Sequence, residues 1–326
     1  MSGRRTRLVY LLAASHSGST LTAFLLGSHP EICTAGELKL TNLGDLERYR
    51  CSCGTPIRQC AFWNSVRDHL AKQGLDFDLS SPGTEFRTVA SPWSRRLLRP
   101  LHRGPFLEAL RDFALHLDPS WPGRRAGAQK TTAMLAEAVC AMTGRPVIVD
   151  SSKVGVRLKY LLRSPDLDIR VVRVIRDGRA VALTYVDPAR FADAREEHLR
   201  GGGSGGDRAA EKLPIAEAAL EWRRSNEEAD AILAGLPRTQ WAEVRYEALC
   251  ADASAALRPA LECIGVDPAA PIALKGSAHH VVGNGMRLDS TREIRLDERW
   301  KTALTADDLA AFDAVAGDYN RKMGYR

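Results

Sequence analysis

A polar loop, Ser15–Thr20, is the first segment of the chain whose residue types suit chemistry. It follows an apolar run, Arg7–Ala14, that predicts a buried strand, and it leads into a predicted helix over Thr20–Ser28. Free N–H groups at the start of such a helix point at a ligand, and the helix dipole favours negative charge there. The loop hydroxyl groups add donors, although Ser and Thr also serve as helix caps. The loop therefore predicts an anion site or, alternatively, a capped turn.

The loop differs from those that bind nucleoside triphosphates, whose pattern is G-x-x-x-x-G-K-[ST]. Ala13 stands where the first glycine belongs, and Ser19 stands at the lysine position. That lysine contacts the β- and γ-phosphates of a triphosphate. Its absence argues against chemistry on ATP.

A second candidate anion site follows the predicted buried strand Ile169–Ile175, where Arg176 and Asp177 are the next residues. In open α/β sheets, ligands bind beyond the carboxyl ends of the strands. Thr184 lies about two turns further along the predicted helix Gly178–Tyr185. A guanidinium group and a hydroxyl on that edge can hold a phosphate. The alternative is a surface pair between Arg176 and Asp177 that binds no ligand.

Several segments, in order, resemble the sulfotransferases that use 3′-phosphoadenosine 5′-phosphosulfate (PAPS), above all their bacterial and tyrosylprotein-type branches. The strand–SGST–helix opening, HPEI…GE, DSSK and RDGRAVALT carry the resemblance over residues 7–37 and 147–187. A fainter similarity returns at VRYEAL (244–249) and GNGMR (283–287), whereas 64–145 match nothing specific. The resemblance implies an enzyme that moves a sulfuryl group from PAPS to an acceptor hydroxyl or amine.

By this resemblance, the first loop holds the 5′-phosphosulfate, and Arg176 with Thr184 holds the 3′-phosphate. Relatives often carry Arg or Lys at the position of His16, and they usually carry Ser at that of Thr184. Threonine keeps the hydroxyl group, and His16 can donate a hydrogen bond without being charged at pH 7. The residues expected to bind the donor are Ser15, His16, Ser17, Gly18, Ser19, Thr20, Arg176, Thr184, Tyr246, Gly283, Asn284 and Arg287.

Glu37, Lys153 and His16 are the expected catalytic residues. Glu37 comes just after the second apparent strand, where family members with a similar GE segment use a glutamate, and we expect it to act as general base. Lys153 follows the predicted strand Val147–Val149, at the same sheet edge, and we expect it to stabilise charge on the leaving phosphate. The alternatives are a Glu37 that complements a helix dipole and a solvated Lys153 behind a helix cap.

Near the C-terminus, the segment HHVVGNGMR combines turn glycines with histidines and an arginine. Gly283 and Gly285 permit close backbone approach to a nucleotide, and Arg287 is expected to reach the 3′-phosphate. His280 is a rival base or an acceptor-site residue. Tyr246 resembles a tyrosine that contacts the nucleotide in relatives, or it is a buried tyrosine whose hydroxyl is hydrogen-bonded.

The chain has seven cysteines, four of them single, which argues against a disulfide framework. Cys51, Cys53 and Cys60 form part of a zinc pattern, but a tetrahedral site needs a fourth ligand, for which His69 is a candidate. We favour three buried or loosely paired thiols. No Asp/Glu/His cluster with catalytic metal spacing appears near either anion loop, so we expect chemistry without a metal.

Strands that alternate with helices predict a P-loop-like α/β fold, with a mostly parallel sheet covered on both faces. We expect one domain over 1–326, with a helical insertion at 51–145 that shapes the acceptor pocket. The other predicted elements are the helices Phe106–Leu117, Val154–Leu162, Glu211–Ala234, Ala251–Ile264 and Ala306–Lys322 and the strand Gln240–Arg245.

The net charge of +6 suits an anionic ligand, but no basic stripe with interleaved aromatic residues predicts nucleic-acid binding. The longest apolar runs are too short to span a membrane, so we expect a cytoplasmic enzyme. Its partner is then a small-molecule, carbohydrate or lipid acceptor. A P-loop-type phosphotransferase and a catalytically inactive nucleotide- or polyanion-binding protein on the same fold remain the alternatives.

Overall fold

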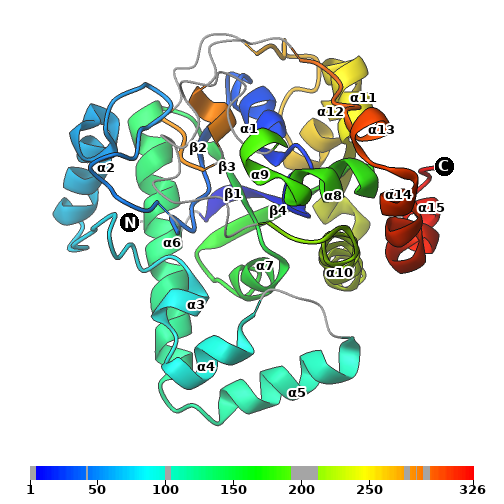
Figure 1. Cartoon of the computed structure of the whole chain (residues 1–326). Helices are drawn as coiled ribbons and strands as arrows, with labels where there is room; N and C mark the ends of the chain where they lie inside the picture. The colour runs from blue at the N-terminus through cyan, green and yellow to red at the C-terminus, as the bar shows by residue number, and fades with distance from the viewer. Residues whose placement is uncertain are drawn as a thin grey trace.

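Five parallel strands form the central sheet of the protein, in the order β2-β3-β1-β4-β5 (Figure 1). The computed structural model describes residues 5–41, 43–99, 104–191, 212–274, 280–283, 285–288 and 294–326. The strands are β1 (Thr6–Ala13), β2 (Ile32–Gly36), β3 (Val147–Lys153), β4 (Leu167–Ile175) and β5 (Trp241–Arg245). The predicted parallel α/β architecture is confirmed.

Helices cover both faces of this sheet. Alternate side chains of β1 point to opposite faces, and they pack into two different hydrophobic cores. Leu8 and Leu12 belong to one core, and Val9 and Leu11 belong to the other. The first face is covered by α2 (Ala61–Lys72), α6 (Trp121–Thr143), α7 (Gly155–Leu161) and α10 (Ile215–Leu233), and the second by α1 (Ser19–Gly27), α11 (Tyr246–Ala251) and α12 (Ala253–Ile264).

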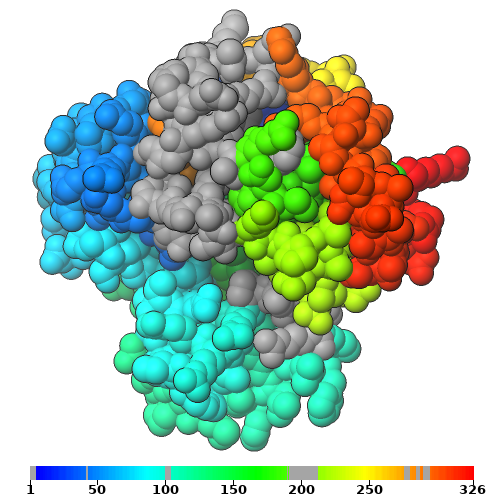
Figure 2. All heavy atoms as spheres, viewed as in Figure 1, coloured from blue at the N-terminus to red at the C-terminus, as the bar shows by residue number. Residues whose placement is uncertain are grey.

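The segment between β2 and β3 is helical in its described part, as predicted for the insertion. Besides α2 and α6 it contains a 3₁₀ turn (Ile57–Gln59), α3 (Phe86–Val89), α4 (Pro92–Leu97) and α5 (Pro105–His116). The cyan residues of this segment form the lower end of the molecule in Figure 2. Its helices start where prolines and caps place them: α5 has Pro105 in its first turn, and the Ser91 hydroxyl caps α4.

Trp222 of α10 and Phe312 of the C-terminal segment pack against α8 (Gly178–Val186). A Cβ atom on Gly178 would lie 2.7 Å from Phe312 Cζ and 2.8 Å from Trp222 Cε3, so only glycine allows this approach. Asn320 Oδ1 accepts a hydrogen bond from Gly178 N. The remaining helices are α9 (Pro188–Phe191), α13 (Trp300–Ala303), α14 (Ala306–Phe312) and α15 (Asp318–Lys322). The end of the chain thereby anchors the start of α8.

Three predicted helices differ from those observed. The predicted helix Ala251–Ile264 is broken at Asp252, whose extended backbone and side-chain bond to Ala255 N start α12 separately. The last predicted helix contains a π-helical turn at Asp313–Gly317, between α14 and α15. The helix predicted from Glu211 begins at Ile215, after Pro214. No helix in the described ranges is long and apolar enough to cross a bilayer.

Glu228 gives the fold a testable dependence on pH. This residue of α10 is buried against Gly155, where a Cβ atom would lie only 2.6 Å from Glu228 Oε2. Burial raises the pKa of Glu228 to about 7, and the nearby Glu108 carboxylate adds to the rise. The folded protein therefore holds a proton here that the unfolded chain loses near its ordinary pKa. The free energy of unfolding should fall as the pH rises from about 4.3 to 7.

Glu228→Gln removes this titration, and it should raise the free energy of unfolding at pH 8 by about 1–3 kcal/mol relative to the native protein. At pH 5 the two proteins should differ much less. Urea unfolding at both pH values measures this. Glu227→Gln, at a half-exposed neighbour paired with Arg223, is the matched control and should show no such pH dependence. The same pH profile in all three proteins would contradict a protonated Glu228.

Candidate functional site

The loop Ser15–Thr20 connects the end of β1 to the start of α1 and leaves that helix start uncapped by any side chain. Its backbone takes left-handed values at His16 (φ 63°) and Gly18 (φ 89°). Ser17 and Ser19 are buried under this bend. The capped turn that the sequence left open is not what forms here. The first N–H groups of α1 therefore receive no side-chain cap, which is the arrangement that an anion-binding helix N-terminus requires.

Tyr246, the first residue of α11, wedges between this loop and Arg176. A Cβ atom on Gly18 would lie 2.5 Å from Tyr246 Cδ2, so the close approach requires glycine. The guanidinium carbon of Arg176 lies 4.4 Å from the centre of the tyrosine ring. Burial raises the pKa of Tyr246 to about 12, and its hydroxyl donates to the carbonyl of Arg295 at 3.3 Å. Tyr246 is thus a neutral, hydrogen-bonded wall of the loop.

Arg176 is buried, and it joins the loop to the C-terminal segment. Its Nη1 donates to His16 O at 2.9 Å, and its Nη2 donates to Asp297 Oδ2 at 3.0 Å. The Asp297 carboxylate also accepts two hydrogen bonds from Arg299, at 2.7 and 2.8 Å. Burial alone would raise the pKa of Asp297, but the two guanidinium groups lower it well below its ordinary value. The Asp297 carboxylate therefore lies between the guanidinium groups of Arg176 and Arg299, where it is held ionised.

The surface pair considered for Arg176 and Asp177 does not form. Asp177 instead pairs with Arg179 at 2.7 Å and accepts from Arg179 N at the start of α8. Thr184 is buried, and its hydroxyl donates to Val181 O at 2.6 Å within the same helix. In this state the Thr184 proton is used inside α8 rather than offered to a ligand.

Glu37 and Lys153 meet at the carboxyl ends of β2 and β3. Lys153 Nζ donates to Glu37 Oε1 at 2.5 Å, and Lys39 Nζ lies 3.1 Å from Glu37 Oε2. All three side chains are at least four-fifths buried. Burial alone would raise the pKa of Glu37, but the two ammonium groups outweigh it and lower the pKa to about 2. Neither alternative for these residues, a helix-dipole glutamate or a solvated lysine, describes what the structure places here.

Asp150, a residue of β3, bonds to the backbone next to both of these residues. Its Oδ1 accepts from Leu38 N at 3.0 Å and from Ser152 N at 2.9 Å, and its Oδ2 accepts from Arg157 Nη2 at 3.2 Å. Asp150 and Arg157 are fully buried. Lys153, three residues after Asp150, has a left-handed φ of 69° and pairs with Leu12 of β1 across a bulge. The pairing places Lys153 within a few residues of the anion loop.

The segment His280–Gly283 lies beside the end of β2 as a short parallel bridge. Val282 N donates to Ala35 O at 3.0 Å, and Glu37 N donates to Val282 O at 3.2 Å. A Cβ atom on Gly283 would lie 3.1 Å from Glu37 Cγ. Gly283 therefore contacts the candidate base directly, while Asn284 lies outside the described residues.

Arg287 differs from its expected role as a phosphate ligand. Its Nε and Nη2 donate to Arg50 O at 3.1 and 2.8 Å, and its Nη1 donates to Gly283 O at 2.5 Å. Its guanidinium carbon lies 4.4 Å from the centre of the Tyr49 ring. In this state Arg287 holds backbone carbonyls together around the segment that contacts Glu37.

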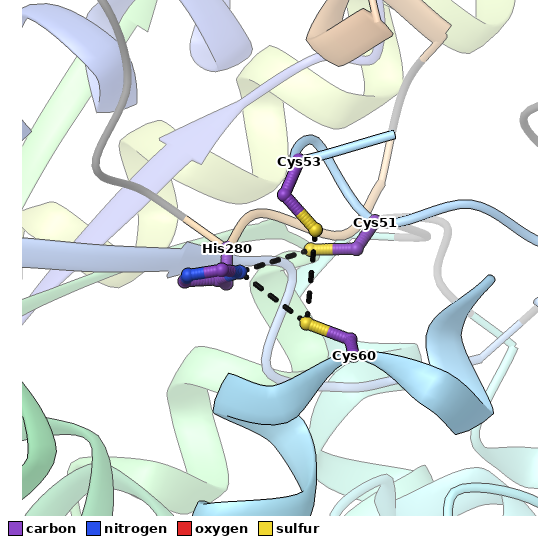
Figure 3. A group of neighbouring side chains, drawn as sticks. All are labelled: Cys51, Cys53, Cys60 and His280. Atoms are coloured by element: carbon purple, nitrogen blue, oxygen red, sulfur yellow. Dashed lines mark hydrogen bonds between the residues drawn. The ribbon is translucent and has the colours of Figure 1, made fainter. Parts of the chain in front are cut away.

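Three cysteines gather around His280, which is not the histidine that the sequence suggested (Figure 3). Cys51, Cys53 and Cys60 approach its ring, and His69 lies apart, 3.3 Å from Glu137. His280 therefore faces thiols, and its expected role as a rival base has no support in the geometry. The sequence reasoning also missed Lys39 and Asp297; only Lys39, two residues after Glu37, had a signal in the sequence.

No family model matches the chain, and neither does any curated protein. Three solved structures are similar to it over its whole length. They are the sulfotransferase domain of the Synechococcus PCC 7002 olefin synthase (17% identity, 100% of this chain and 97% of that chain, TM-score 0.52), the sulfotransferase domain from the curacin biosynthetic pathway (15%, 99% and 99%, 0.48) and the sulfotransferase STF9 from Mycobacterium avium (13%, 100% and 78%, 0.47). At these identities the first match shows the fold. The resemblance seen in the sequence is confirmed at that level.

Removing Lys153 should raise the pKa of Glu37. Lys153→Met keeps the aliphatic length but removes one of the two ammonium groups that oppose the effect of burial. The pKa should rise from about 2 to at least its ordinary value of about 4.3. A ¹³C NMR titration of the side-chain carboxyl carbons, with Glu37→Gln to assign the signal, measures the change.

Lys301→Met is the control for this titration, because Lys301 forms an exposed pair with Glu298 at 2.5 Å. It should leave the Glu37 signal unchanged. A Glu37 pKa that stays near 2 in Lys153→Met would show that Lys39 and the backbone suffice to hold the carboxylate ionised.

Proposed function

We propose that this chain, which has the fold of the sulfotransferases, transfers a sulfuryl group from PAPS to an acceptor hydroxyl or amine. One observation carries the proposal: an uncapped helix N-terminus lies next to a buried lysine–glutamate pair at the carboxyl ends of β1, β2 and β3. Sulfuryl transfer needs an anion cradle, a cation at the leaving oxygen and a base at the acceptor. These groups supply all three.

In the proposed reaction, the loop Ser15–Thr20 binds the 5′-phosphosulfate through the N–H groups that open α1. Lys153 neutralises charge on the phosphate oxygen that leaves, and Glu37 takes the proton of the acceptor. Arg176, which already contacts the loop carbonyl of His16, binds the 3′-phosphate in place of Asp297. The reaction is a displacement at sulfur in which the acceptor oxygen or nitrogen gains the sulfuryl group and adenosine 3′,5′-bisphosphate departs.

Binding of the donor should also activate the base. In the free protein the Glu37 carboxylate forms ion pairs with both Lys153 and Lys39. With a pKa of about 2, it is a weak proton acceptor. Lys153 cannot give its full charge to Glu37 and to an anionic donor at once. When Lys153 turns to the phosphosulfate, burial of Glu37 raises its pKa again. Proton abstraction is thereby favoured once the donor is present.

The helical insertion is the proposed acceptor side of the site. The Thr84 hydroxyl donates to Lys39 O at 2.9 Å, and Arg157 Nη1 donates to Thr84 O at 2.5 Å. The insertion thus contacts the backbone that carries Glu37. A small molecule, carbohydrate or lipid that presents a hydroxyl group from this side would meet the base.

Adenosine 3′,5′-bisphosphate should stabilise the protein against heat more than ATP with Mg²⁺ does, because only the former matches two anion sites.

Arg176→Ala should weaken bisphosphate binding by about 1.5–3 kcal/mol, the scale of a charge-assisted hydrogen bond. Affinity for adenosine 5′-phosphosulfate, which lacks the 3′-phosphate, should hardly change. Calorimetric titration of both ligands measures this. Equal losses for the two would show that Arg176 does not read the 3′-phosphate.

Asp297→Asn provides the converse test. It keeps the side-chain shape but removes the carboxylate that competes for Arg176, so bisphosphate affinity should rise. Weaker binding in this variant would mean that Asp297 orients Arg176 for the ligand rather than competing with it.

The two catalytic candidates should respond differently to the acceptor. Glu37→Gln should leave donor affinity almost unchanged and lower turnover of an alcohol by ~10²–10⁴, the range for loss of a general base. Lys153→Ala should lower both turnover and donor affinity. An acidic phenol needs little help to lose its proton, so it should rescue Glu37→Gln and not Lys153→Ala. Undiminished turnover of an alcohol by Glu37→Gln would end the candidacy of Glu37.

A further inference from the structure

Three thiols and one imidazole converge at the start of the helical insertion (Figure 3). The Sγ atoms of Cys51, Cys53 and Cys60 and a ring nitrogen of His280 all lie within 4.8 Å of one another. His280 Nδ1 lies 3.3 Å from Cys60 Sγ and 3.6 Å from Cys51 Sγ, and the Cys53 and Cys60 sulfurs are 3.8 Å apart. His280, which is 220 residues from Cys60 and 229 residues from Cys51 in the sequence, thus joins three neighbouring cysteines in one cluster of ligand atoms.

The three individual separations of 3.3, 3.6 and 3.8 Å are close to those in a tetrahedral zinc site. Zinc lies about 2.3 Å from thiolate sulfur and about 2.0–2.1 Å from imidazole nitrogen. Tetrahedral angles then place two sulfur ligands about 3.8 Å apart and a sulfur and a nitrogen about 3.5 Å apart. Three thiolates and one imidazole form a closed donor set, which is typical of structural rather than catalytic zinc.

The backbone holds this arrangement by its own hydrogen bonds. Gly54 N donates to Cys51 O at 2.8 Å, in a turn that requires the left-handed φ of 84° at Gly54. Ser52 N donates to Val281 O at 3.2 Å, and Val281 N donates to Ser52 Oγ at 2.8 Å. The His280 ring stacks on Phe62, with ring centres 4.6 Å apart and an interplanar angle of 6°. The ligands are therefore oriented by contacts that need no metal.

A disulfide explains the cluster less well than an ion. All seven cysteines are free thiols. The 3.8 Å between the Cys53 and Cys60 sulfurs is far longer than the roughly 2.05 Å of a disulfide bond. A bond between these two would also leave Cys51 and His280 facing it with no role. One ion, by contrast, uses all four ligands.

We propose that Cys51, Cys53, Cys60 and His280 bind one structural Zn²⁺ ion. The ion fastens the start of the insertion to the segment His280–Gly283. In that segment, Val282 O accepts a hydrogen bond from Glu37 N, and Gly283 packs against the Glu37 side chain. Zinc thereby positions the wall of the site beside Glu37 without touching the reacting atoms.

Metal analysis by mass spectrometry of the full chain, expressed with zinc and purified under reducing conditions, tests the site. Native protein should contain one zinc per chain. Cys53→Ser and His280→Asn should contain less than a fifth of that. The matched controls Cys263→Ser and His69→Asn, which change the same residue types outside the cluster, should keep full occupancy. Zinc-free native protein, or equal occupancy in all four variants, would overturn the proposal.

Cobalt substitution of the native chain keeps the test valid if the ligand variants fail to fold. Co²⁺ should give the intense visible and thiolate charge-transfer bands of a tetrahedral site with three sulfur ligands. Mass mapping that finds a Cys53–Cys60 disulfide in the reduced preparation, or iron in place of zinc, would reject the zinc assignment.

Hydrogen exchange tests the positioning role. Removing zinc from the native chain should speed exchange at the Glu37 and Val282 amides at least ten-fold, and it should leave the β4 and β5 amides unchanged. Equal exchange with and without zinc would show that the ion does not fix this wall. An effect on turnover rests on the proposed function, whereas metal content and exchange do not, so the two ideas can fail separately.

Discussion

The buried carboxylate of Asp150 is the constraint on which the candidate site at the edge of the sheet depends. A charge with no exposed surface costs several kcal/mol unless it is paired and fully hydrogen-bonded. Its partners are Arg157, the Leu38 N–H and Ser152. These come from α7, from the segment that carries Glu37 and from the end of β3. Satisfying one buried charge thus fixes where Glu37 and Lys153 leave the sheet, before either of them meets a ligand.

In the free protein, carboxylates of the chain itself neutralise the cationic side chains of the candidate site. Glu37 lies between two lysines, and Arg176 holds Asp297. Each cation that an anionic donor would use already has a carboxylate partner, so donor binding must be an exchange of ion pairs. The net affinity is then a difference between similar electrostatic terms, and it gives selectivity for ligands whose anions match both positions.

The sheet, the helical insertion and the positions of Glu37 and Lys153 at strand ends were predictable, because each follows from a local pattern: an apolar run, proline punctuation or a residue that follows a strand. The ion pair between Glu37 and Lys153 was not predicted. The pair of Arg176 with Asp297 was not predictable, since its partners are 121 residues apart and no periodicity links them. The same reason made His69 a plausible neighbour of the thiols where His280 is the actual one. The break at Asp252 was missed because a capping aspartate also fits an unbroken helix face.

The bridge between Gly36 and Val282 has a consequence for folding. β2 is an edge strand, and unpaired edges attract other chains; the segment His280–Gly283 covers this one by pairing with Ala35 and Glu37. Roughly 250 residues separate the two partners, which at ~5–20 residues per second leaves the edge open for ~12–50 s during synthesis. Gly36 also takes a left-handed φ of 84°, which turns the chain away from a regular strand at that point. The regular stretch of this edge that a neighbouring nascent chain could extend before the late partner arrives is therefore shorter.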